Sequence, residues 1–229
     1  MTSRIAWCPA YRLVAARLPR MDIFESVSAA ADLEAVLEIE ALTNPRIRPA
    51  IGRIGAIPVR DRVTGPGAAF VMSAFAYPGN NRFSDEAHGA YYAAEELVTA
   101  IAEVRFHRER FAAQTPTPPM DFDERIVEAD IVADVRDVRD LPATSPIYDP
   151  NPANYHQSQA LAAEARAAGA DGIIYNSVRN RGGSCVAIFI PRLIVNARTT
   201  GYIGLRWDGK RITDSYRKDS LMRPYPDLP

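Results

Sequence analysis

The stretch Asp171-Gly172-Ile173-Ile174-Tyr175-Asn176-Ser177-Val178-Arg179 is a mostly apolar run that ends in polar side chains. A short apolar run bounded by turn residues is typical of a buried β-strand, and we expect one over Asp171 to Val178. The segment 180–184 contains two glycines and predicts a turn, and the apolar run Cys185 to Pro191 predicts a second strand. Ser177 is then expected at the end of the first strand, with Arg179 just beyond it.

Helices are predicted where apolar residues recur at helical spacing. The clearest begins near Glu95, and five of its apolar side chains fall within roughly 100° of one another, which defines a buried stripe: Leu97, Ala100, Ile101, Val104 and Phe111. Glu103 and His107, four residues apart, lie on one border of this stripe, where a side chain can face a cleft. Two further helices are expected over Asp32 to Thr43, stopped by Asn44-Pro45, and over Tyr155 to Ala168, closed by Gly169.

The remaining elements are shorter and irregularly interleaved. Turn residues at 77–81 place Arg82 at the edge of a turn, and Asp208-Gly209 predicts a hairpin. Loops are expected at 114–124 and 141–154, and strands at 5–20 (broken by Pro9 and Pro19), 68–75, 90–93, 125–138, 202–207 and 210–216. This order does not fit a doubly wound sheet. It favours an α+β fold with a mixed or antiparallel sheet and flanking helices, in a single domain over 1–229 with its core at about 4–216 and a tail at 217–229.

Composition excludes several functional classes. The 229 residues include 27 basic and 28 acidic side chains, a net charge of −1, so the clustered positive charge of a nucleic-acid-binding protein is not expected. No apolar run approaches a membrane span, and the first residues lack the apolar region of a signal peptide, which favours a cytoplasmic protein. Cys8 and Cys185 have no metal-binding or redox spacing and are expected as free thiols, and the three histidines show no ligand spacing, so no metal is expected.

Five short pieces carry the candidate chemistry: Tyr11-Arg12, Asn81-Arg82-Phe83-Ser84, Tyr91-Tyr92-Ala93-Ala94, Glu103-Val104-Arg105-Phe106-His107, and the stretch quoted first. They supply an arginine, a tyrosine, a glutamate and a serine in this order, each on an apolar framework. Arginine binds phosphate through a planar fork, and a fixed carboxylate stabilises a sugar cation. The set therefore favours a site for a phosphate-bearing nucleotide.

These pieces, in this order, resemble the RES-domain family, whose members are typically toxins of toxin–antitoxin pairs. The resemblance runs from about Arg4 to Tyr216 and implies a fold similar to ADP-ribosyltransferases, NAD as substrate and an Xre-type antitoxin as partner. It assigns the family arginine to Arg82, the glutamate to Glu103 and the serine to Ser177, with Tyr92 as the tyrosine before the helix. The chain departs from the family at Asn81, where the family often has glycine.

The resemblance implies a role for each residue. Glu103 would stabilise the positive charge that develops on ribose as the nicotinamide–ribose bond breaks; its alternative is a solvated glutamate paired with Arg105 or His107. Arg82 would hold a phosphate, against the alternative of a surface-turn arginine. Tyr92 would offer a π-face to the cationic nicotinamide ring (or be only a core tyrosine), and Ser177 would hydrogen-bond a phosphate or the nicotinamide amide (or only cap the strand). His107 would tune the carboxylate or contact the ribose (or be only a packed helix histidine), and Arg12 and Arg179 would make secondary phosphate contacts.

Three functions remain open at this point. The favoured one is an NAD-consuming toxin that cleaves NAD by hydrolysis or phosphorolysis. ADP-ribosyl transfer to a protein uses the same bond cleavage with another acceptor. A protein that binds a nucleotide or an antitoxin without turnover is the alternative of a different class. Sequence leaves the oligomeric state open.

Overall fold

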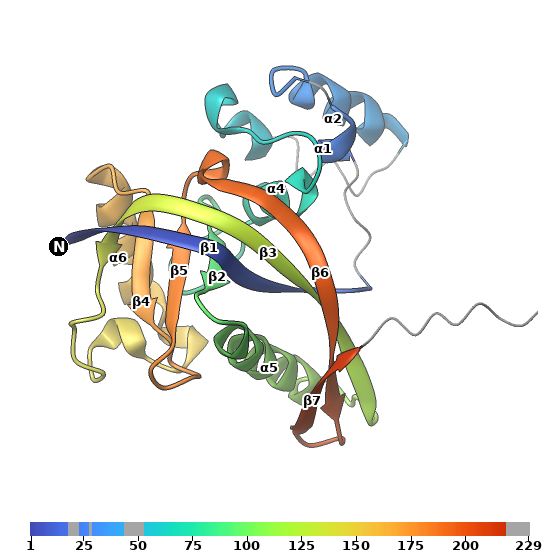
Figure 1. Cartoon of the computed structure of the whole chain (residues 1–229), viewed down its shortest axis with the longest axis vertical. Coiled ribbons are helices and arrows are strands. Elements are labelled where there is room, and N and C mark those ends of the chain that lie inside the picture. The colour runs from blue at the N-terminus through green and yellow to red at the C-terminus, as the bar shows by residue number, and fades with distance from the viewer. Residues whose placement is uncertain (18–22, 28, 44–52, 219–229) are drawn as a thin grey trace, which may run out of the picture.

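The computed structural model describes residues 1–17, 23–27, 29–43 and 53–218. Its centre is a seven-stranded mixed sheet in the order β1-β2-β5-β4-β3-β6-β7 (Figure 1). The strands are β1 (Thr2–Ala15), β2 (Tyr91–Ala94), β3 (Met120–Asp137), β4 (Gly172–Asn176), β5 (Ser184–Ile188), β6 (Ile194–Trp207) and β7 (Ile212–Lys218). β3 and β4 are parallel, and the other neighbouring pairs are antiparallel. The predicted α+β class with a mixed sheet is confirmed.

β1 pairs with two strands, β2 and β3, and this closes the first part of the sheet into a ring. Its pairing with β3 extends along nearly the whole strand, from Thr2 to Ala15. Its pairing with β2 consists of one register pair, Tyr11 with Ala94. Because the two strands are joined at only one point, side chains on either side of it can line a hollow in the sheet.

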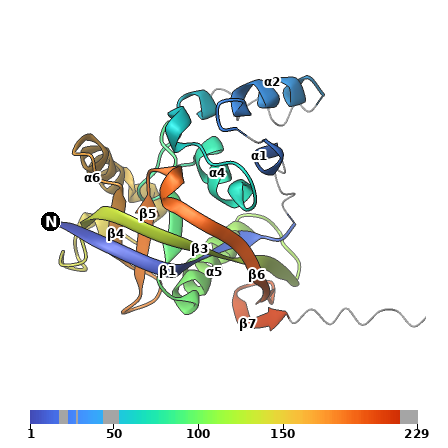
Figure 2. The same ribbon diagram turned by 45° about the horizontal axis from the view of Figure 1, so that its top comes forward.

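Helices cover the sheet from two sides (Figures 1 and 2). Their bounds are α1 (Ile23–Ser26), α2 (Leu33–Thr43), α4 (Ala68–Ala76), α5 (Leu97–Ala113) and α6 (His156–Ala167). Side chains alternate between the faces of a strand, and the two core clusters follow this alternation. Ile174 and Val186 pack in the cluster that includes α4, whereas Tyr175 and Cys185 pack in the cluster that includes α5 and α6.

Several predicted elements are confirmed close to their expected bounds. They include the strand at 90–93, the strand–turn–strand unit of β4 and β5, and the helices α2, α5 and α6. Gly169 follows the C-cap residue Ala168 of α6 and has a φ of 78°, as expected of a glycine that ends a helix. The hairpin at Asp208-Gly209 joins β6 to β7, although β6 begins earlier than predicted, at Ile194.

The strand predicted over 68–75 is wrong, because this segment is the helix α4. Seven of its residues are buried, since the helix lies between the sheet and the cluster formed with α1 and α2. Phe70 and Phe75 pack toward the sheet, whereas Met72 packs toward those helices. A helix covered on both sides is apolar all round and loses the periodicity that distinguishes it from a strand.

Three other details also differ from prediction. β1 is not broken at Pro9, because Pro9 lies at a register shift between Trp7 and Ala10 where the ladder does not need its missing N–H. β3 begins at Met120 inside the predicted loop 114–124, paired with Trp207. Phe111, predicted in the buried stripe of α5, is 58% exposed, and the neighbouring Ala112 is buried instead. Pro19, Asn44-Pro45 and residues 219–229 of the predicted tail lie outside the described residues, whereas residues 217 and 218 of that tail belong to β7.

Candidate active site

A cavity of about 240 Å³ opens where β1 and β2 are joined by their single register pair. β1, β2 and α5 form most of its wall, with side chains from the segment before β2, from the residue before α6, and from β4 and β5. Its polar and aromatic lining consists of Tyr11, Arg12, Asn81, Arg82, Tyr92, Glu103, His107, Tyr155, Tyr175 and Cys185. Five of the seven predicted site residues therefore line one cavity, although they come from four separate segments of the chain.

Glu103 is held at the cavity wall by Ser177, the sixth predicted site residue. The Ser177 hydroxyl donates a hydrogen bond of 2.6 Å to Oε1 of Glu103. The same hydroxyl oxygen accepts from the backbone N–H groups of Arg179 at 3.1 Å and Asn180 at 2.9 Å. Ser177 thus caps the end of β4 and orients the carboxylate of Glu103. Its expected hydrogen bond to a phosphate or to the nicotinamide amide stays a prediction, since Ser177 is not among the residues that line the cavity.

The alternative view of Glu103 as an ion-paired surface glutamate does not fit the structure. Arg105, one of its two alternative partners, lies 3.3 Å from a carboxylate oxygen of Glu109 and donates to the carbonyl of Ile212 at 2.7 Å. The carboxylate of Glu103 is instead half-buried and faces the cavity. It is the only carboxylate among the lining residues of the described chain.

Arg82 is a buried cation with neutral partners. It is 6% exposed, so the alternative of a surface-turn arginine is wrong. Its guanidinium donates to the carbonyls of Ile147 and Asp149 and to the hydroxyl of Tyr155, whose ring centroid lies 4.6 Å away. Among the described residues no carboxylate lies within ion-pair distance of it, so its charge is balanced by dipoles and a π-face alone.

Arg12 brings a second guanidinium to the cavity from β1. It lies 4.7 Å from the ring centroid of Tyr91 and donates to the carbonyl of Tyr92 at 3.4 Å. Burial lowers the pKa of Arg12 from its ordinary value, and the nearby Tyr91 and Tyr92 oppose that shift. In the described part of the chain it has no ion-pair partner either. Two arginines facing one carboxylate leave the cavity positively charged, which suits an anionic ligand.

Tyr92 has two tasks in this structure. Its hydroxyl accepts from the backbone N–H of Phe83 at 2.8 Å and donates to the hydroxyl of Ser84 at 3.1 Å, while its ring lines the cavity. Burial raises the pKa of Tyr92 to about 12, so the phenol is neutral at physiological pH. The hydroxyl holds the segment that carries Arg82, and the ring remains available to a ligand.

His107 lines the cavity one helical turn beyond Glu103 and keeps solvent access. Its pKa does not stay near the 6.5 of an ordinary histidine. Desolvation lowers the pKa of His107 to about 4, together with the positive charges of four arginines: Arg179, Arg110, Arg108 and Arg82. The imidazole is therefore neutral at pH 7. It can exchange hydrogen bonds with a ligand without adding positive charge beside Glu103.

Arg179 is the one predicted site residue that neither lines the cavity nor contacts Glu103. Its guanidinium carbon lies 3.3 Å from the ring centroid of Phe106, and it donates to the carbonyl of Pro150 at 2.5 Å. The side chain thus links the β4–β5 turn to α5 and to the segment before α6. Its backbone N–H supports Ser177, which is an indirect contribution to the site.

Sequence reasoning missed Tyr155 and Cys185 as lining residues. Tyr155 precedes α6 and lies beneath the Arg82 guanidinium, a contact between residues far apart in sequence that no local pattern indicates. Cys185 could have been found from the alternation along β5, since it shares a face with the apolar cluster under α5. Burial, the main cause, and the nearby Glu103 carboxylate raise the pKa of its thiol, so Cys185 stays protonated and is a poor nucleophile.

No group of three or more His, Cys, Asp or Glu side chains in residues 1–17, 23–27, 29–43 and 53–218 is arranged to hold a metal ion. Within the same residues, no helix has both the length and the apolar character needed to cross a membrane.

A match to a family model identifies the protein family of this chain. The family model described as the RES domain matches residues 59–208, more than half of the chain. The chain belongs to the RES domain family. This match includes Arg82, Tyr92, Glu103 and Ser177, whereas Arg12 lies before it.

Two individual proteins are also similar to this RES domain chain. The uncharacterized protein y4oC of Sinorhizobium fredii (strain NBRC 101917 / NGR234) is 26% identical over 222 residues, which cover 91% of this chain and 87% of that protein. Among solved structures, the M. tuberculosis MbcT–MbcA toxin–antitoxin complex contains a chain that is 10% identical, with a TM-score of 0.44 and coverage of 89% of this chain and 86% of that one.

Proposed function

We propose that this chain is an enzyme that consumes NAD by cleaving its nicotinamide–ribose bond, and that it acts as the toxin of a toxin–antitoxin pair. One observation carries the proposal. The carboxylate of Glu103, fixed by Ser177 at 2.6 Å, shares a cavity with the guanidinium groups of Arg12 and Arg82. A single oriented carboxylate and two cations without carboxylate partners among the described residues match a ligand that carries phosphates and develops a positive charge.

The chemistry of the bond explains why one carboxylate suffices. Nicotinamide in NAD is a cationic ring, so it takes the bonding electron pair and leaves as a neutral molecule that needs no proton from an acid. The positive charge moves to the ribose, which becomes oxocarbenium-like in the transition state. A carboxylate already fixed near that sugar stabilises this charge without reorganising. Because His107 is neutral, it does not oppose the charge.

The arginines would supply the binding energy. Arg82 and Arg12 would contact the oxygens of the diphosphate, to which guanidinium groups bind through paired N–H donors. Tyr92 and Tyr155 present ring faces at the same cavity, and such faces attract cationic and planar groups. β1 contributes Arg12 to the cavity and α5 contributes Glu103, so the diphosphate and the sugar would be held by different walls of the cavity.

Three acceptors of the ADP-ribose group are distinguished by experiment: water, phosphate and a protein side chain. We favour small acceptors, hydrolysis or phosphorolysis, because the described cavity holds no second carboxylate that could activate an incoming protein nucleophile. Purified chain is incubated with NAD alone, with added phosphate and with lysate proteins, and free nicotinamide and labelled protein are measured. Release of nicotinamide without protein labelling is expected. Protein labelling in step with nicotinamide release would establish transferase activity instead.

The Glu103→Gln variant separates catalysis from binding. The amide keeps the size of the side chain but loses its charge, so turnover is expected to fall by about 10²–10³ while NAD is still bound. Glu96→Gln is the matched control, because Glu96 is exposed at the start of the same helix and makes no side-chain cap. Unchanged turnover in Glu103→Gln would show that the catalytic group lies elsewhere. NAD binding without any turnover in the parent chain would favour the non-catalytic alternative.

The toxin role is tested by co-expression. Enzymes that deplete NAD arrest growth, so expression of the parent chain is expected to stop growth and Glu103→Gln to relieve the arrest. We propose an Xre-type antitoxin as the partner, as the family resemblance implies. A small helix-turn-helix gene beside the gene for this chain should restore growth and co-purify with it. Toxicity that persists beside a stably expressed neighbour would reject this pairing.

A further inference from the structure

Arg82 lies on a segment that has no helix or strand of its own. The only ladder within it is an isolated bridge between Asn81 and Ser84. The segment must nevertheless hold a buried guanidinium in one place, because an arginine that binds phosphate loses affinity when its position fluctuates. Its backbone therefore needs support from other elements.

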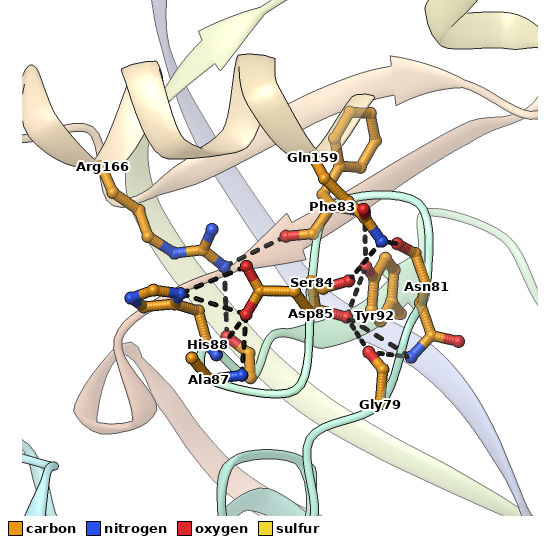
Figure 3. A network of polar contacts seen from close by, with 11 residues as sticks. Gly79, Asn81, Phe83, Ser84, Asp85, Ala87, His88, Tyr92, Gln159 and Arg166 are labelled. Atoms are coloured by element: carbon orange, nitrogen blue, oxygen red, sulfur yellow. Dashed lines mark hydrogen bonds and ion pairs between the residues drawn. The ribbon is translucent and has the colours of Figure 1, made fainter. Parts of the chain in front are cut away.

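Gln159 of α6 supplies this support on both sides of Arg82 (Figure 3). Its side-chain nitrogen Nε2 donates to the carbonyl of Asn81 at 3.1 Å and to the carbonyl of Ser84 at 3.1 Å. One carboxamide thus joins the two ends of the bridge and closes the turn that presents Arg82.

Arg166 holds the next part of the segment from the same helix. It lies seven residues after Gln159, and residues at this spacing share one face of a helix. Its guanidinium donates to the carbonyl of Phe83 at 3.0 Å and to that of Gly89 at 3.3 Å, and it stacks 3.8 Å from the ring centroid of Phe189. The face of α6 therefore lies along the whole segment 81–89 (Figure 3).

The same helix also holds the partners of the Arg82 side chain. Ser158, the buried neighbour of Gln159, donates at 3.0 Å to the carbonyl of Ile147, which is one of the two carbonyls that accept from Arg82. Tyr155, directly before α6, contacts the guanidinium with its ring and hydroxyl. The N-terminal part of α6, together with Tyr155 directly before it, thus holds both the backbone and the side chain of Arg82 in place.

We propose that Gln159 is a positioning residue for Arg82 and that, through it, α6 sets the affinity of the site for the phosphate groups of its ligand. The inference rests on the proposed function for the identity of that ligand, NAD. Gln159 does not line the cavity, so it acts through the 81–84 turn and not through contact with the ligand.

The test uses Gln159→Ala and Gln159→Glu in the full chain. Glutamate keeps the size of glutamine but has no N–H donor, so both variants should lose the two contacts. The KM for NAD is expected to rise about tenfold, a factor that corresponds to 1.4 kcal/mol, with kcat changed by less than about twofold. Gln157→Ala is the matched control, because Gln157 is an exposed glutamine on the same helix; its KM should equal that of the parent.

Amide hydrogen exchange gives a readout that does not depend on NAD. The backbone amides of residues 81–84 are expected to exchange faster in both Gln159 variants, with the rest of the chain unchanged. Unchanged exchange at 81–84, or a Gln159→Glu variant with the KM of the parent, would overturn the positioning role. A parent chain that neither binds nor cleaves NAD would refute the proposed function, and the exchange comparison would still decide the role of Gln159.

Discussion

Ser177→Ala is the most informative single perturbation of this site. It removes one oxygen atom from a residue that is 8% exposed. That oxygen donates to Glu103 at 2.6 Å and accepts from the amides of Arg179 and Asn180 at 3.1 Å and 2.9 Å. Three hydrogen bonds are therefore lost together, while the backbone of β4 and the charge of Glu103 are kept.

The structure permits an estimate of both effects. A hydrogen bond to a charged group contributes about 1.5–3 kcal/mol and one between neutral groups about 0.5–1.5 kcal/mol. Because the three bonds are only partly buried, water replaces some of the loss, and we expect the free energy of unfolding to fall by about 3 kcal/mol. The carboxylate keeps its charge but not its orientation, so turnover should fall by about tenfold to a hundredfold, less than in Glu103→Gln.

Urea unfolding and nicotinamide release measure the two quantities on the same preparation. Ser215→Ala is the control, since Ser215 is an exposed serine on β7 and should alter neither. Turnover equal to that of the parent, in a variant that has lost about 3 kcal/mol of stability, would mean that Ser177 only caps the strand. Unchanged stability as well would refute the geometry on which the estimate rests.

Three further predictions follow from other contacts. Arg82→Lys should weaken NAD binding at least tenfold in a titration, because one ammonium cannot make the contacts of a planar fork; equal binding would contradict the bidentate role. The pKa of His107 is lowered from 6.5 to about 4, so its NMR signal, assigned by comparison with His107→Gln, should titrate near pH 4, and titration near 6.5 would contradict this. Because the unfolded chain then binds a proton more readily than the folded chain, the free energy of unfolding should decrease as the pH falls from about 6.5 to 4. Arg108→Met leaves the carboxylate of Glu124, 1% exposed, without its 2.5 Å partner, and urea unfolding should show a loss of about 3 kcal/mol; a stable variant would show that the pair does not anchor α5.

The predictability of the fold varied with the surroundings of each segment. α5 and α6 have one covered face and one solvated face, so their apolar spacing indicates helices. α4 is covered on both sides, so its continuous apolar run predicts a strand where the structure has a helix. Phe111 fits the stripe of α5 by angle alone, yet it lies near the end of the helix and is 58% exposed. Spacing shows which face can be buried but not how far the neighbouring layer extends.

The candidate site shows the same limit. Arg82, Tyr92, Glu103 and Ser177 could be named from short pieces in a fixed order, because each piece combines a polar residue with an apolar framework. Tyr155 could not, since its place under the Arg82 guanidinium depends on how α6 packs against the 81–84 turn. The low pKa of His107 could not either, because it results from desolvation and from arginines on three separate segments.

The sequence by itself determined the helices with one apolar face, the strand–turn–strand unit that ends in Ser177 and the residues of the RES domain family. Only the tertiary structure decided that the hydroxyl of Ser177 reaches Glu103, 74 positions away, and that Arg12 and Arg82 share one cavity. The physical reason is that periodicity records which side of a single element is buried. The closure of β1 onto both β2 and β3 depends on pairing between distant strands, and this closure brings the two arginines and the carboxylate together.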